Sequence, residues 1–76
     1  MSVQINQRTL RLHDTGEDVQ RLQNFLNAFD YGSLAEDGVF GGSTEAAVKR
    51  YQSDCGLPED GIVGSGTWGR IMHDLG

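Results

Sequence analysis

The chain has 76 residues, of which 37% are hydrophobic, and its six basic and eleven acidic side chains give a formal charge of −5. This length predicts a single domain with a modest core, since such a chain buries roughly 60% of its unfolded surface on folding. The negative charge disfavours nucleic acid and anionic membranes as partners, and no apolar run of about 18 residues is present to span a bilayer.

The amino-terminal residues 1–8 lack the apolar segment of a secretory signal. We therefore expect that the chain as given does not direct its own export, so that its localisation must be inferred from its partner. We assign residues 1–9 to a lead-in and residues 10–76 to one domain. The single cysteine, Cys55, excludes an internal disulfide, so we expect packing alone to hold the fold.

A short extended segment and a helix are predicted in the first half of the chain. Residues 9–12 alternate polar and apolar, which predicts an extended lead-in with Leu10 and Leu12 facing the core. Thr15 and Asp18 have capping-box-like spacing at the start of a helix that we expect to run from about 17 to 29. Its apolar stripe consists of Val19, Leu22, Leu26 and Phe29.

Two further helices are predicted in the second half. Ser43 can cap a helix that ends at Gly56, in a left-handed cap before Pro58. Its buried stripe consists of Ala47, Val48, Tyr51 and Cys55. A third helix opens near residues 66–67 and turns Trp68, Ile71, Met72 and Leu75 inward. These elements predict an all-α fold, a small three-helix bundle.

One loop pattern occurs twice. Residues 37–44 and 60–67 both read Asp-Gly-apolar-apolar-Gly-x-x-Thr, 23 residues apart. The preceding helices share the pattern Val-x-Arg-apolar or aromatic-Gln, beginning at Val19 and Val48, 29 residues apart. The first copy therefore contains six extra residues, which fall within residues 27–36.

The repeated loops have a structural interpretation. Asp-Gly favours a tight turn, and we expect the two apolar residues after it to fill the core. Gln23 and Gln52 occupy equivalent helical positions. We expect their amides to satisfy backbone groups of the adjacent loops, because irregular buried backbone needs hydrogen-bond partners.

The chemical groups of the chain favour structural roles over catalysis or metal binding. Cys55 with His13 or His73 lacks the accompanying loop and third member of a nucleophilic site. Cys55 to Asp60 resembles the zinc-blocking cysteine switch of metalloproteinase propeptides, but its place in the repeat favours a helix end. Asp37 and Asp60 lack the alternating ligands of a calcium loop. We predict no metal site and no cofactor.

The chain resembles the type 1 class of peptidoglycan-binding domains over about residues 10–75. The residues that match its pattern are Gly16, Val19, Leu22, Gln23, Asp37, Gly38, Phe40, Gly41, Thr44, Ala47, Val48, Tyr51, Gln52, Gly56, Leu57, Asp60, Gly61, Val63, Gly64, Thr67 and Trp68. Gly42 and Ser65 stand where the family often has proline, and Tyr51 replaces a commoner phenylalanine.

The resemblance implies a three-helix module that binds bacterial cell-wall peptidoglycan, through glycan or stem peptide, and tethers a fused or associated hydrolase to the wall. It implies a monomer, without catalysis of its own, within an exported extracellular, periplasmic or cell-wall protein. The alternative is a structural or protein-interaction domain of the same fold that has lost wall binding.

We expect the ligand site at the six-residue insertion, because lengthened loops on rigid scaffolds collect ligand contacts. Asn27, Tyr31 and Leu34 of this region would border the site together with Asp37, Phe40 and the face of the second helix. We expect a shallow cleft there, beside the second helix. Trp68 could serve as a sugar platform, but its helical spacing favours the core. The predicted ligand-binding residues are Asn27, Tyr31, Leu34, Asp37, Phe40 and Tyr51.

Overall fold

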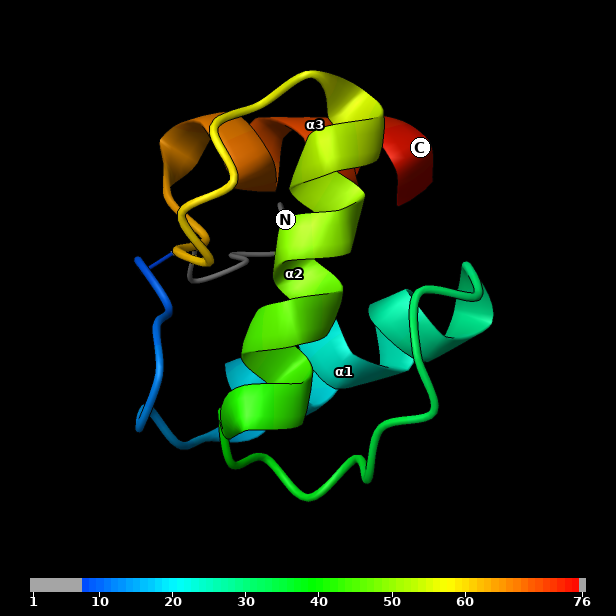
Figure 1. The fold of residues 1–76 in the computed structure, drawn as a ribbon. Helices are drawn as coiled ribbons and strands as arrows, with labels where there is room; N and C mark the ends of the chain where they lie inside the picture. The colour runs from blue at the N-terminus through cyan, green and yellow to red at the C-terminus, as the bar shows by residue number, and fades with distance from the viewer. Residues whose placement is uncertain (1–7, 76) are drawn as a thin grey trace, which may run out of the picture.

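The computed structural model describes residues 8–75, which form three helices: α1 (Glu17–Ala28), α2 (Gly42–Cys55) and α3 (Ser65–Leu75). In Figure 1, α2 crosses the centre of the molecule, with α1 behind one of its ends and α3 behind the other. The predicted all-α, three-helix fold is confirmed. Each helix begins within two residues of its predicted position, and α1 and α2 also end within two residues of theirs. Among the described residues no helix is long and apolar enough to cross a membrane.

The core draws side chains from all three helices and from the segments between them. The predicted inward positions Val19, Leu22 and Leu26 are confirmed, and Phe25 joins them at 4% exposure. The prediction of burial is wrong for two residues. Phe29 is 43% exposed just beyond the end of α1, and Leu75 is 58% exposed in the last turn of α3. The buried apolar residues are Leu10, Val19, Leu22, Phe25, Leu26, Phe40, Ala47, Val48, Tyr51, Val63, Trp68 and Ile71.

The extended segment before α1 joins the two repeated loops. Leu10 exchanges backbone hydrogen bonds with Val63, at N···O distances of 3.1 and 2.8 Å. Five residues later, Thr15 forms an isolated antiparallel bridge with Val39 of the first loop. As predicted, Leu10 is fully buried and Leu12 packs against the core. Residues 1–7 of the predicted lead-in lie outside the described residues, whereas Arg8 already contacts the domain.

The helix starts differ from the predicted caps. Gly16 and Gly41 occupy the N-cap positions of α1 and α2, without a side-chain cap, so Thr15 and Ser43 do not cap these helices. Gly16 has φ 140°, a conformation that L side chains rarely adopt, which explains why the backbone enters α1 at a glycine. The end of α2 is as predicted, with Gly56 in the left-handed conformation at φ 72°.

The two repeated loops are braced by one glutamine each, as predicted. Gln23 Oε1 accepts from the Gly38 backbone N–H at 2.9 Å, and its Nε2 donates to the Val39 carbonyl at 2.9 Å. Gln52 makes the matching pair of bonds with Gly61 and Ile62, at 3.0 and 2.9 Å. The internal repeat is therefore a repeat of hydrogen bonding as well as of sequence.

Each glutamine also reaches the aspartate and the threonine of its loop. Gln23 Nε2 lies 3.2 Å from Asp37 Oδ1 and 3.1 Å from Thr44 Oγ1. The corresponding distances from Gln52 are 3.1 Å to Asp60 and 3.2 Å to Thr67. In each copy, the glutamine of the preceding helix is thus hydrogen-bonded to the aspartate and the threonine of the loop, and these contacts hold the loop against that helix.

We expect the two loop aspartates to make stability depend on acid pH. The Val39 N–H, with the Gln23 amide, holds the pKa of Asp37 below its usual range, and the Ile62 N–H, with the Gln52 amide, does so for Asp60. Because folding lowers these pKa values, their contribution is present above about pH 4, where an unfolded aspartate ionises, and is lost as the pH falls below it.

This pH dependence can be measured by urea unfolding between pH 6 and pH 3. The double variant Asp37→Asn, Asp60→Asn is expected to lose less stability over that range than the wild type, because asparagine does not titrate. Equal pH profiles for the two proteins would contradict the assignment.

Candidate ligand-binding groove

The predicted insertion forms an ordered loop that is pinned to α1. Asn27 exchanges two hydrogen bonds with the backbone of Leu34, at 2.8 and 2.9 Å, and its Nδ2 also donates to Glu36 Oε2 at 3.0 Å. Gln20 Nε2 donates to the Glu36 carbonyl at 2.8 Å. Asn27 therefore holds the loop from the last turn of α1, and its side-chain amide is largely occupied.

Tyr31 and Leu34 are the two half-buried apolar side chains of this loop, and both pack against the core. The Tyr31 ring lies edge-on to the ring of Tyr51, with centroids 5.2 Å apart. Burial, and then a hydrogen bond with Asp54, raise the pKa of the Tyr31 phenol. Both residues keep some exposed surface, and a role for them in ligand binding stays a prediction.

The placement of Phe40 and Tyr51 on a cleft wall is wrong. Their side chains are 0% and 1% exposed, because Phe40 follows the tight turn directly into the core and Tyr51 lies on the inner face of α2. The Tyr51 hydroxyl donates to Asp74 Oδ2 at 2.7 Å, which ties α2 to the last turn of α3. Burial, followed by this bond, raises the Tyr51 pKa. Asp37 is exposed, but it holds the Val39 N–H of its own turn at 3.0 Å.

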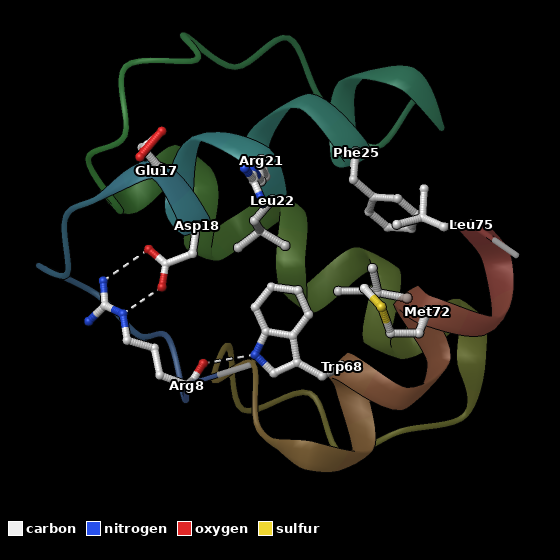
Figure 2. Close-up of a pocket in the computed structure, with 10 residues that line it drawn as sticks. Arg8, Glu17, Asp18, Arg21, Leu22, Phe25, Trp68, Met72 and Leu75 are labelled. Carbon is white, nitrogen blue, oxygen red and sulfur yellow. Dashed lines mark hydrogen bonds and ion pairs between the residues drawn. The ribbon is translucent and has the colours of Figure 1, made fainter. Parts of the chain in front are cut away.

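A groove of about 450 Å³ lies elsewhere, between α1 and α3, within the range of small-molecule sites, about 300–1,000 Å³. Figure 2 shows Leu22 and Phe25 pointing from α1 toward Trp68, Met72 and Leu75 of α3. These side chains make an apolar floor and one wall. The charged residues at its rim are Arg8, Glu17, Asp18 and Arg21.

An ion pair closes one end of the groove. Arg8 Nε and Nη2 donate to the two carboxylate oxygens of Asp18, at 2.5 and 3.1 Å, as Figure 2 shows. Arg8 Nη2 also donates to the Thr15 carbonyl at 2.6 Å. The hydrogen bond from Arg8 holds the pKa of Asp18 below its usual range. Both charges are therefore engaged with each other.

Trp68 belongs to the core, as its spacing predicts, while an edge of its ring lines the groove. The residue is 4% exposed, and its indole Nε1 donates to the Arg8 carbonyl at 2.8 Å. The ring therefore fixes the start of the domain against α3.

The residues that line this groove were not among the predicted ligand residues. Asp18, Leu22 and Phe25 recur at helical intervals on α1, and Trp68, Met72 and Leu75 do so on α3. This periodicity indicates two helix faces, but it does not indicate that a groove lies between them. A second hollow of about 460 Å³ adjoins the first, sharing Arg21, Phe25 and Leu75 and extending to the exposed Phe29.

Within residues 8–75, no group of three or more His, Cys, Asp or Glu side chains lies together as a metal site. Cys55 is the last residue of α2, where it is half-buried and packs against the core. The position agrees with its predicted structural role at the helix end.

The fold is a duplicated helix-and-loop unit completed by a third helix, and comparison with known proteins identifies its family. A family model described as a putative peptidoglycan binding domain matches residues 15–71. The chain belongs to this family.

Several known proteins are similar to this chain. It is 43% identical over 67 residues to the Zinc D-Ala-D-Ala carboxypeptidase of Streptomyces albus G, covering 86% of this chain and 26% of that protein. It is 42% identical over 61 residues to an uncharacterised protein of Kitasatospora aureofaciens, covering 79% of this chain and 52% of that protein. The chain thus spans about half or less of these two relatives.

Among solved structures, the crystal structure of the SleB N-terminal domain superposes with a TM-score of 0.89 at 30% sequence identity. The superposition covers 96% of this chain and 100% of that domain. The similarity therefore extends over nearly the whole three-helix fold.

Proposed function

We propose that this chain is a non-catalytic module that binds bacterial cell-wall peptidoglycan through the groove between α1 and α3. The observation that carries the proposal is the groove itself: an apolar floor with a charged rim, in a domain of the peptidoglycan-binding family. A few polar groups around an apolar floor are the usual composition of a ligand site.

The module would act by tethering. A carboxypeptidase among its relatives is about four times longer than the aligned segment, which supports an attached catalytic domain as the partner. Even affinity on the order of millimolar is useful to such an enzyme, because tethering raises its effective concentration near a repetitive substrate. The proposal places the chain in an exported protein at the wall, acting as a monomer.

Co-sedimentation with purified insoluble peptidoglycan tests the proposal. We expect the wild type to enter the pellet and Leu75→Glu to bind roughly tenfold more weakly, because a carboxylate on the apolar wall must be desolvated. Leu75 is 58% exposed, so this change should leave folding intact. Absence of wild-type co-sedimentation at high protein concentration would refute wall binding and favour a structural role.

The same assay compares the two candidate faces of the module. Tyr31→Ala alters the predicted insertion without touching the groove, so it is the matched variant for Leu75→Glu. Loss of binding in Tyr31→Ala alone, with both variants folded, would move the binding site to the inserted loop.

A further inference from the structure

At the rim of the groove, one arginine forms no ion pair with any of residues 8–75. Among residues 8–75, the ion pairs join Arg8 to Asp18 and Arg70 to Asp74, and neither involves Arg21. Arg21 is exposed on α1 and lines both the groove and the hollow next to it. Since Arg8 and Asp18 neutralise each other, Arg21 is the rim cation that, within the described part of the chain, remains available for an incoming anion.

An acidic group accompanies this cation. Glu17 precedes Arg21 by four residues, which places both on the same face of α1, and it also lines the groove. No ion pair in the described chain involves Glu17. The rim can therefore face a ligand that carries a carboxylate and an ammonium group, with apolar parts directed to the floor between them.

The aromatic residues of the groove are poorly placed to bind a sugar ring. Trp68 and Phe25 are each 4% exposed, so neither offers an open ring face, and the Trp68 indole N–H is already bonded to the Arg8 carbonyl. A sugar also requires several partners for its hydroxyl groups, whereas the floor is formed by Leu22, Met72 and similar apolar side chains.

We infer that the groove reads the stem peptide of peptidoglycan rather than its glycan, with Arg21 as the specificity-determining residue that binds a peptide carboxylate. The inference rests on the proposed function. Stem peptides combine the features that the groove matches: alanine methyl groups, free carboxylates and, at the diamino acid, an ammonium group. A guanidinium can hold a carboxylate with two parallel hydrogen bonds.

The internal repeat supplies a matched control for Arg21. Arg50 occupies the equivalent position on α2, is also exposed, and does not line the groove. Arg21→Gln and Arg50→Gln therefore remove the same charge from the same repeat position, and only the first removes it from the groove. Equal melting temperatures would establish that both variants fold.

Titration of the protein with two soluble probes distinguishes binding of the stem peptide from binding of the glycan. One is the synthetic pentapeptide L-Ala-γ-D-Glu-L-Lys-D-Ala-D-Ala, and the other is a peptide-free oligosaccharide of alternating N-acetylglucosamine and N-acetylmuramic acid. Trp68 is the single tryptophan of the chain, so its indole N–H resonance reports directly on the groove. We expect the peptide to bind, Arg21→Gln to weaken it about tenfold, and Arg50→Gln to leave its affinity unchanged.

A third probe tests the carboxylate itself. The same peptide with every carboxyl group converted to an amide should bind the wild type as weakly as the acid form binds Arg21→Gln. For this probe, Arg21→Gln should cause no further loss.

The remaining outcomes overturn the inference. Peptide affinity equal in Arg21→Gln and Arg50→Gln would remove Arg21 from recognition, and preferential binding of the oligosaccharide would assign the groove to glycan. If insoluble peptidoglycan is bound but neither soluble probe is, the stem-peptide inference fails while the proposed function stands. If insoluble peptidoglycan is not bound, the proposed function itself fails.

Discussion

Gln52→Ala is expected to lower the free energy of unfolding by about 3–5 kcal/mol. The substitution leaves the Gly61 N–H and the Ile62 carbonyl without their present partners and opens a cavity, since Gln52 is 1% exposed. A domain of this length has a total stability of about 4–11 kcal/mol. The variant should therefore unfold at a much lower urea concentration than the wild type.

Gln23→Ala should cause a loss of similar size, because Gln23 makes the same four contacts with the first loop. Gln20→Ala is the control. Within residues 8–75 this exposed side chain makes a single hydrogen bond, to the Glu36 carbonyl, so its removal should lower the free energy of unfolding by about 0.5–1.5 kcal/mol. If Gln52→Ala lowers the free energy of unfolding by no more than Gln20→Ala does, Gln52 does not brace its loop.

The repeat explains why the framework was predictable from sequence. Gln23 and Gln52 occupy the same position in the two copies of the motif. A residue that both copies share is expected to support the common loop, so both glutamines could be assigned a structural role. Helix positions followed from apolar periodicity, and Gly56 followed from its place after a helix and before Pro58. These are local signals, and the structure retains them.

Within the loops, the pattern did not distinguish the two apolar residues. Both were predicted to fill the core, but Val39 is 49% exposed and Ile62 is half-buried, whereas Phe40 and Val63 are fully buried. Successive residues of an extended segment point to opposite sides, so only the second of each pair faces inward. The prediction that both residues of each pair face the core is therefore wrong for the first residue of each pair.

The groove was missed for a different reason. It depends on how α1 and α3 pack against each other, and these two helices are more than 30 residues apart in sequence. Leu75 illustrates the difficulty: its spacing from Trp68 predicts a core position, yet it stands at the open edge of the groove. At the insertion, the side-chain amide of Asn27 is bonded to the backbone of Leu34, a contact that the sequence pattern did not indicate.

Phe40→Ala is expected to lower the free energy of unfolding by about 3–5 kcal/mol, the usual cost of removing a buried phenylalanine ring. Val39→Ala is the matched control in the same loop, because a change at an exposed side chain should remain within about 0.5 kcal/mol of the wild type. Urea unfolding of both variants, followed by circular dichroism, measures the difference.

The same pair of variants separates folding from binding. Phe40 lies in the core and does not line the groove, so the fraction of Phe40→Ala that remains folded should bind peptidoglycan with unchanged affinity. Any loss of co-sedimentation in this variant should therefore be proportional to its unfolded fraction. Lowering the temperature to one at which the variant folds should restore binding. A variant that folds fully but no longer binds would instead support the predicted role of Phe40 in ligand binding.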